Sequence, residues 1–459
     1  MPDENPFFRR FSTYRRPTNR WRHWLGAAVG LIALAFLVYN IPFVHDRLAW
    51  RLDELRSSIV RFFNPPELAV FVPEENQAAI ASATAAALTP EATRTPLAAS
   101  ATPPPAEPPI PPAESLTGFK YIDQHGGWNL CGPATLAMAL TYWGWNGTRN
   151  DVEDYVKPGL DVSNMNRLDR GYPDKNVMPY ELEDFVDSQV PGLQAVMRVG
   201  GDLERIKRFI AAGFPVIVEK GSECDTGGRI TWCGHYLFVT GYDDGKEEFT
   251  VQDVYLRTGE DGTGANLTSS FDEFNDQWRA FNYLFIVIYP EERVDEVIAL
   301  LGPWADEQWA NEYALEVAKE ESTTLTGLDQ YFAWFNVGSS HVRLFQYVDA
   351  AFAYDYAFDL YANLPNDTIK LPFRMLWYQT GPYWAYYYSG RYRDVINLAN
   401  ITLSTLDDPT LEESLYWRGL AYLALGETDN AIADLQEAVR INPNFWAGWQ
   451  QLEALGLSG

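Results

Sequence analysis

Cysteine is scarce in this chain, with three residues among 459. Cys224 and Cys233 bracket a polar loop, while Cys131 stands far from both. Eight residues separate the pair, a spacing that lacks the compactness of a zinc site. An even pair plus one odd thiol favours one disulfide and one reactive cysteine if this part of the chain lies in an oxidising compartment. Two free thiols and a metal site are the alternatives.

Basic residues are also few, with 35 Lys and Arg against 62 Asp and Glu and a formal charge of −27. Residues 1–63 hold ten arginines and five acidic residues, so the excess of acid lies entirely in the remainder. A strongly acidic body argues against nucleic acid as a partner. The same charge is a mild indication of basic substrates or partners, although it also serves simply to keep a protein soluble.

Apolar residues are plentiful, at 47% of the chain with 15% aromatic. This composition excludes disorder throughout, and the length predicts several domains instead of one core.

The stretch 24–44 runs for 21 residues without a formal charge and corresponds to roughly 31 Å of helix, enough for a bilayer core. We predict a transmembrane helix here, preceded by a basic tail over 1–23. A cleavable signal peptide is the alternative, but the stretch is long for a signal core and no small-residue cleavage site follows it. More unopposed arginines precede the stretch than follow it, so the tail is expected in the cytoplasm and the rest of the chain outside.

Two segments connect this stretch to the folded part of the chain. Residues 45–63 carry apolar residues at helical spacing with arginines between them, which predicts an amphipathic juxtamembrane helix or a continuation of the spanning helix. Residues 64–117 are rich in Pro, Ala and Thr without periodicity, and are expected to form a disordered linker.

Residues 118–290 combine helical and strand patterns. Helices are predicted at 131–144, 179–188 and 202–212, and strands at 214–220, 235–242, 248–255 and 283–289. Helices first and an antiparallel sheet afterwards indicate an α+β domain.

Residues 291–459 are expected to be entirely helical, with a repeat at the end. Over 411–444, the small and turn residues fall at tetratricopeptide spacings: Gly419, Tyr422, Gly426, Ala431, Ala438 and Pro443. A looser repeat covers 381–409, and a weak third one includes Gly338, Ala350 and Ala357. Such repeats stack to bury a common core and commonly bind a protein partner.

The odd thiol, Cys131, opens an apolar helix. The helix dipole and free backbone N–H groups at this end favour a thiolate. His235 follows as the expected general base at the start of a strand, and Asp253, 18 residues later on the neighbouring strand, would orient the imidazole. Gln124 in the loop before the cysteine is the expected side-chain donor of an oxyanion hole.

Each of these residues also has a purely structural interpretation. A cysteine opening an apolar helix is often a small buried hydrophobe, a histidine in a strand is often a satisfied core residue, and Asp253 would also suit the cap of a turn. We interpret His125 as an ordinary loop residue. Residues 174–181 suit either a substrate loop or a helix entry, and the aromatic residues over 332–388 suit either a peptide groove or a repeat core.

The motifs Trp128-Asn129-Leu130-Cys131-Gly132-Pro133-Ala134 and Gly234-His235-Tyr236, together with Gln124, resemble the papain-like family of double-glycine leader (bacteriocin-processing) peptidases, in its broad extracytoplasmic branch. The resemblance covers about 119–289. It implies Cys131 as nucleophile, His235 as base, Asp253 as the orienting acid and Gln124 as the oxyanion donor. The leader peptidases proper are fused to an exporter, and none is recognisable here, so leader removal is not expected.

The sequence therefore predicts a membrane-anchored extracytoplasmic cysteine peptidase acting on a peptide or protein, without a cofactor, whose helical repeats bind a protein partner. The alternatives are a catalytically inactive peptide-binding scaffold, and a thioester-forming acyltransferase or amidase of the cell envelope.

Overall fold

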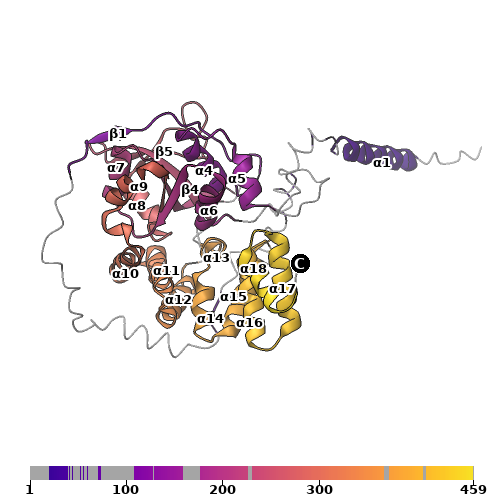
Figure 1. The fold of residues 1–459 in the computed structure, drawn as a ribbon. Helices are drawn as coiled ribbons and strands as arrows, with labels where there is room; N and C mark the ends of the chain where they lie inside the picture. The colour runs from indigo at the N-terminus through magenta and orange to yellow at the C-terminus, as the bar shows by residue number, and fades with distance from the viewer. Residues whose placement is uncertain are drawn as a thin grey trace, which may run out of the picture. The chain divides into compact units, whose positions relative to one another are not determined.

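The computed structural model describes residues 20–39, 41, 44, 52, 55, 59, 71–73, 108–127, 129–158, 176–225, 230–365, 372–406 and 410–457. The chain divides into two units, residues Met1–Ala49 and Trp50–Gly459. Figure 1 shows the helices and strands of both.

Among the described residues of the first unit, 20–39 form helix α1 (Arg20–Tyr39). Its apolar side chains are open to solvent, with Trp24 76% and Ile32 69% exposed. Across the part of the chain that the structure describes, no helix is both long enough and apolar enough to span a bilayer. The transmembrane helix predicted for 24–44 thus coincides with α1 only in part, and residues 40, 42 and 43 lie outside the described residues.

Most of the two connecting segments also lies outside the described residues. Leu52, Leu55 and Ile59 of the predicted juxtamembrane helix are helical and exposed. The predicted linker is not structureless throughout. Phe71 is buried with its ring centroid 5.0 Å from that of Phe358, and β1 (Ala113–Ser115) pairs with a central strand. Neither feature could be predicted, because a three-residue strand and a single buried ring are too short to give a periodic pattern in a Pro-rich sequence.

The centre of the second unit is a seven-stranded sheet, and all of its described pairings are antiparallel. Its order is β2-β7-β3-β4-β5-β6, with β1 paired to β4 off this path. The strands are β2 (Leu193–Arg198), β3 (Val216–Asp225), β4 (Ile230–Asp243), β5 (Glu248–Gln252), β6 (Leu267–Ser270) and β7 (Phe285–Pro290). The predicted antiparallel α+β domain is therefore confirmed in its architecture.

Helices cover both faces of this sheet, because the strands are apolar on both sides. Ile217 and Phe238 pack into one core with α4 (Cys131–Tyr142) and α6 (Pro179–Gln189). Val216, Leu237 and Val239, which alternate with them, pack into the opposite core. That second core contains α7 (Leu203–Ala211), α8 (Phe271–Arg279) and α9 (Val294–Leu301). In Figure 1, α4 and α6 lie on the other side of the strands from α7 to α9.

The described residues that follow β7 are mainly helical (Figure 1). After the short η3 (Glu291–Arg293) and η4 (Gly302–Ala305), the helices are α10 (Glu307–Thr324), α11 (Gly327–Arg343), α12 (Tyr347–Ala362), α13 (Met375–Tyr378), α14 (Gly381–Tyr388), α15 (Tyr392–Ser404), α16 (Glu412–Ala424), α17 (Thr428–Ile441) and α18 (Trp446–Ala454). Pairs form at the predicted repeat positions, α11 with α12, α14 with α15 and α16 with α17. A Cβ at Gly338 would lie 2.6 Å from the ring of Tyr354, so the small residue permits the close helix contact.

Several element boundaries differ from the predictions. His235 was expected at the start of a strand but lies inside the 14-residue β4, because β4 begins at Ile230 in the arm of the hairpin that the Cys224–Cys233 disulfide joins to β3. β5 ends at Gln252, so Asp253 follows the strand instead of lying within it. Four further elements were not predicted: α5 (Arg149–Val156), β2, β6 and α8.

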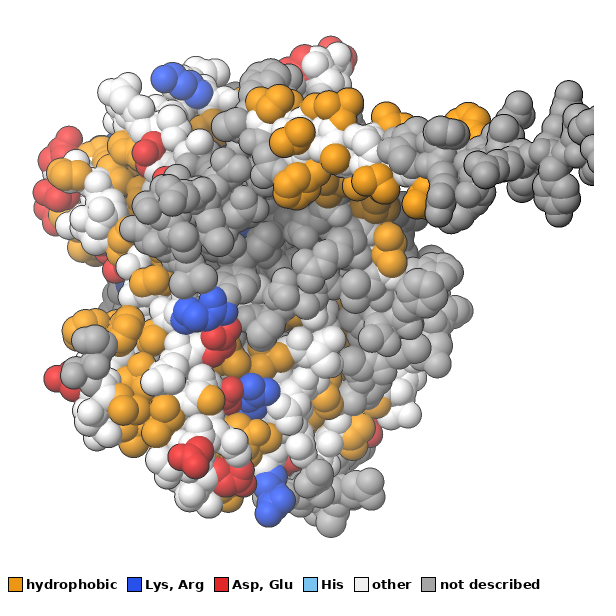
Figure 2. All heavy atoms as spheres, turned by 90° about the vertical axis from the view of Figure 1, so that its right-hand side faces the viewer, with side chains coloured by type: hydrophobic (Ala, Val, Ile, Leu, Met, Phe, Trp, Pro, Cys, Tyr) orange, Lys and Arg blue, Asp and Glu red, His pale blue; other side chains and the backbone are white. Residues whose placement is uncertain are grey.

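Charged side chains are sparse among the coloured residues of the face drawn in Figure 2. Among the coloured residues of that face, the few Lys and Arg side chains are scattered and mostly lie beside acidic ones. This arrangement agrees with the overall excess of acid.

Candidate active site

Cys131 is the first residue of α4 and is 9% exposed. The helix is apolar along nearly its whole length, so it is buried on all sides, and Pro133 in its first turn suits a position that needs no N–H donor. The residue before the helix, Leu130, provides no side-chain cap. The first-turn N–H groups are therefore not consumed by a capping side chain, and the helix dipole acts directly on the sulfur.

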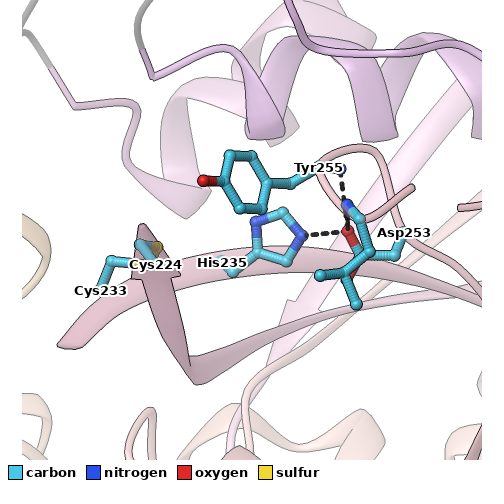
Figure 3. The surroundings of a disulfide bond; sticks show 6 residues. Cys224, Cys233, His235, Asp253 and Tyr255 are labelled. Atoms are coloured by element: carbon cyan, nitrogen blue, oxygen red, sulfur yellow. Dashed lines mark hydrogen bonds and ion pairs between the residues drawn. A yellow bond between two sulfur atoms is a disulfide. The ribbon is translucent and has the colours of Figure 1, made fainter. Parts of the chain in front are cut away.

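His235 and Asp253 are brought together by the β4–β5 pair. Phe238 of β4 is in register with Gln252 of β5. Asp253, which follows Gln252, therefore lies beside the part of β4 that carries His235. The His235 Nε2 atom lies 3.1 Å from Asp253 Oδ1, with both residues buried (Figure 3). The same Oδ1 accepts hydrogen bonds from the backbone N–H groups of Tyr255 at 2.8 Å and Leu256 at 2.9 Å. The backbone of the turn therefore holds the carboxylate in place, and the carboxylate holds the imidazole in place.

The electrostatics link all three residues. Burial opposes ionisation of Cys131, but a hydrogen bond and charge from His235, with backbone bonds from Tyr236 and Gly132, lower the pKa of the thiol. Burial also opposes the charged form of His235, but Asp253 and Cys131 outweigh it and raise the pKa of the imidazole to about 9. Burial raises the pKa of Asp253, yet His235 and the Leu256 N–H hold it well below its usual range. The arrangement favours a thiolate beside an imidazolium.

The loop of Asp253 is held by a second set of contacts. Its carbonyl oxygen accepts a hydrogen bond from the Tyr121 hydroxyl at 2.8 Å, and its N–H donates to the Gly264 carbonyl at 2.9 Å. Gly264 N–H in turn donates to the Tyr121 hydroxyl. A Cβ at Gly264 would lie 2.0 Å from the Asp253 carbonyl oxygen, so only glycine allows this approach.

Gln124 lies in a loop next to the same turn. Its backbone N–H donates to the carbonyl oxygen of Val254, the residue after Asp253, at 3.0 Å. The Gln124 backbone therefore contacts the turn that carries Asp253. Its Oε1 is buried without a hydrogen-bond partner among the described residues, so the amide is not fully engaged by the fold. His125 stacks on Tyr255 and bonds Asp123, which fits the predicted loop residue.

The predicted disulfide between Cys224 and Cys233 is present. It joins β3 to β4 near the end of their hairpin, next to the strand segment that carries His235 (Figure 3). Cys131 is the free cysteine. Within the described ranges, no group of three or more His, Cys, Asp or Glu residues is arranged to hold a metal ion.

Sequence reasoning missed two buried residues close to Cys131. Glu219 on β3 is 1% exposed, pairs in register with Tyr236, and has an Oε1 without a partner among the described residues. Burial, and then the charge of Cys131, raise its pKa well above the usual value. In the sequence, Glu219 could have been noticed as an acidic residue inside an otherwise apolar strand. Tyr378, from α13, lies beside Gly234, and nothing in the local sequence indicated it.

The Peptidase_C39 like family model matches residues 116–286. The tetratricopeptide repeat model matches residues 412–445, which correspond to α16 and α17. None of the curated protein sequences compared with this chain matches it.

Two solved structures are similar. A putative C39-like peptidase from Bacillus anthracis is 18% identical with a TM-score of 0.30, covering 39% of this chain and 98% of its own. Xylellain, a cysteine protease from Xylella fastidiosa, is 15% identical with a TM-score of 0.23, covering 48% of this chain and 91% of its own. By the two family models, the chain carries a region similar to the Peptidase_C39 like family, followed by a C-terminal tetratricopeptide repeat.

Proposed function

We propose that this protein is a cysteine peptidase that hydrolyses a peptide or protein substrate with Cys131 as nucleophile, His235 as general base and acid, and Asp253 as the orienting carboxylate. The observation that carries the proposal is the linked set of three side chains, in which a thiol of lowered pKa meets an imidazole bonded to a buried carboxylate. The match to the C39-like family model over the same residues supports it.

In this mechanism the Cys131 thiolate attacks the scissile carbonyl carbon, and the C=O pair of electrons moves to oxygen. We assign the stabilisation of that oxyanion to the Gln124 amide and the Cys131 N–H. The His235 imidazolium then protonates the leaving amine, and the C–N bond breaks to leave a thioester. Imidazole takes a proton from water, whose oxygen attacks the thioester, and the thiolate leaves to restore the starting state.

The thiol itself provides the test. Iodoacetamide should alkylate Cys131 well below pH 8.5, the region in which an ordinary thiol is mostly unreactive. Cys131→Ala should abolish labelling of the native protein, because Cys224 and Cys233 are bonded to each other. His235→Ala should restore the pH profile of an ordinary thiol. A wild-type profile like that of a free cysteine would contradict the proposal and favour the scaffold without catalysis.

Water and amines compete for the same thioester, so one further assay separates hydrolysis from acyl transfer. Product formed from a peptide ester or amide in the presence of an added primary amine is analysed by mass spectrometry. We expect the free acid as the main product. Amine incorporation as the main product would replace the peptidase assignment with an acyltransferase.

The cellular setting is part of the proposal. The uncharged stretch 24–44 with arginines before it supports a membrane anchor with residues 45–459 outside the cytoplasm. The Cys224–Cys233 disulfide supports an oxidising compartment. The tetratricopeptide match over 412–445 supports a protein partner for the helical region.

A further inference from the structure

The edge of β4 beside the catalytic pair has no neighbouring strand over its first half. β5 pairs with β4 only from Phe238 onward, so among the described residues the segment from Ile230 to Leu237 has β3 on one side and no strand on the other. Backbone N–H groups of alternate residues face the same edge of a strand. Gly234 and Tyr236, which flank His235, therefore present their N–H groups together at this open edge.

Each of these two N–H groups has a specific partner. The Tyr236 N–H lowers the pKa of the Cys131 thiol, and the Gly234 N–H lowers the pKa of the Tyr378 hydroxyl, so each N–H faces that partner. Positions two residues apart along a strand are about 7 Å apart. The Tyr378 hydroxyl and the Cys131 sulfur are thus neighbours along one strand edge, and the charge of Cys131 acts on the Tyr378 hydroxyl.

The ring of Tyr378 fits the same segment closely. A Cβ at Gly234 would lie 2.9 Å from the Tyr378 ring and 2.6 Å from that of Phe281. The ring also makes edge contacts with Trp232 and Phe281, with centroids 5.9 and 5.8 Å away. Tyr378 is 7% exposed, so little water reaches the part of β4 against which its ring packs.

Helix α13, which carries Tyr378, is fastened to both parts of the molecule. The Trp377 carbonyl accepts a hydrogen bond from Asn176 Nδ2 at 3.1 Å, and Gln379 Nε2 donates to the Ala280 carbonyl at 2.8 Å. On the repeat side, Trp377 Nε1 donates to Thr405 Oγ1 at 2.9 Å, directly after α15. These contacts leave Tyr378 little freedom to move away from β4.

We propose that Tyr378 is a positioning residue for His235, so that the C-terminal helical region completes the active site instead of forming a separate module. The inference rests on the proposed peptidase function for the role of His235. The hydroxyl pairs the N–H adjacent to the histidine, and the ring fills the space at Gly234. Without the hydroxyl, a buried N–H is left unpaired, and the strand shifts to find another partner.

The test compares two buried tyrosines of the helical region. Tyr378→Phe removes the hydroxyl bonded to Gly234 and keeps the ring. Tyr383→Phe is the matched control, because the Tyr383 hydroxyl is also fully buried and pairs with Ser414 Oγ at 3.0 Å. Both variants lose one buried hydrogen bond in the full chain, but only the first touches β4.

The main readout is the titration of His235, followed by NMR on protein with isotope-labelled histidine and assigned by the signal lost in His235→Ala. We expect Tyr378→Phe to move the titration midpoint from about 9 toward the ordinary value. Tyr383→Phe should leave it unchanged at a comparable loss of melting temperature. The alkylation of Cys131 near pH 6 should slow about tenfold in Tyr378→Phe alone, as expected for one lost buried hydrogen bond.

The two proposals fail in different ways. If the His235 titration of Tyr378→Phe overlays that of Tyr383→Phe, the positioning role is wrong even if Cys131 is fully reactive. If wild-type Cys131 reacts as an ordinary thiol, the peptidase proposal is wrong, while the histidine titration still decides the role of Tyr378.

Discussion

Asp253 directs its Oδ1 at three donors, His235 Nε2 and the N–H groups of Tyr255 and Leu256. Asp253→Asn keeps the shape of the side chain and removes its charge. We expect kcat/KM on a peptide substrate to fall by about a hundredfold or more, because the imidazolium loses its counter-charge and its orientation. Asp243→Asn is the matched control, since Asp243 ends the same β4 and pairs with Lys246 at the surface. Equal losses in both variants would contradict the orienting role.

The same pair sets a pH dependence whose direction is fixed by the two pKa shifts. His235 is raised from 6.5 to about 9, so its contribution to stability is complete below the unfolded value and is lost as pH rises through about 9. Asp253 is lowered, so its contribution is present above its unfolded value, near 4, and is lost as pH falls through the lowered one. Wild type should therefore lose more melting temperature than Asp253→Asn between pH 6.5 and 9.5. Parallel curves in a thermal shift assay would contradict this.

Among single residues, those that carry an established chemical pattern could be predicted from the sequence. Cys131, His235 and Asp253 stand in motifs with a fixed order, and the structure brings them into contact. Glu219 and Tyr378 could not be predicted, because their nearness to Cys131 depends on strand register and on a helix more than 240 residues away in the chain. The residues that neighbour Glu219 and Tyr378 in the sequence do not indicate contacts with residues so far away along the chain.

At the scale of elements, the β3–β4 hairpin is closed by the Cys224–Cys233 bond over a sequence separation of 9. Replacing both cysteines by serine should lower the free energy of unfolding by about 2–3 kcal/mol, because the unfolded chain regains its loop entropy. Thermal unfolding measures this loss, with Cys131→Ser as the control for a lost thiol. The hairpin is continuous with Gly234 and His235, so we expect its loosening to disturb the catalytic site before the rest of the sheet.

Alkylation of the unfolded protein checks the bond itself. Of the three cysteines, one should react without reductant and all three after reduction, as counted by intact mass. Three reactive thiols in the unreduced protein would show that the bond is absent and would remove the support it gives to an oxidising compartment.

Elements with strong periodicity were predicted well and those with weak periodicity were not. The helices beginning at Cys131, Pro179 and near Leu203 were found from their apolar spacing. β2 and β6 were missed because they are half-buried edge elements with mixed polarity. In the repeats, Phe345 holds the left-handed conformation, with φ of 59°, that Gly390 and Gly426 hold after the first helices of the later pairs. The weak third repeat lacks glycine at this turn and was correspondingly hard to detect.

At the scale of the whole molecule, the sheet and the repeats share one continuous core. Tyr378 and Trp377 join residues of α4 and β4 in the same buried cluster, which also contains Phe71. Phe71, the sheet and the helical pairs are therefore coupled by packing, so a partner bound to the repeats has a physical route to the cysteine through α13. The sequence predicted the repeats but could not predict this coupling, because each repeat pattern is satisfied locally.

The placement of the chain across a membrane is a prediction for the whole protein. In intact cells, a membrane-impermeant thiol reagent should label Cys131 if residues 45–459 lie outside the cytoplasm, and the chain should stay with membranes after carbonate extraction. Leu31→Arg combined with Leu34→Arg should release it, because two charges in the stretch 24–44 cost about 5–7 kcal/mol on insertion scales. Leu52→Arg with Leu55→Arg is the control, with equal charge placed outside that stretch. Labelling only after lysis would place the peptidase in the cytoplasm, and a shortened chain released without any substitution would identify the stretch as a signal peptide.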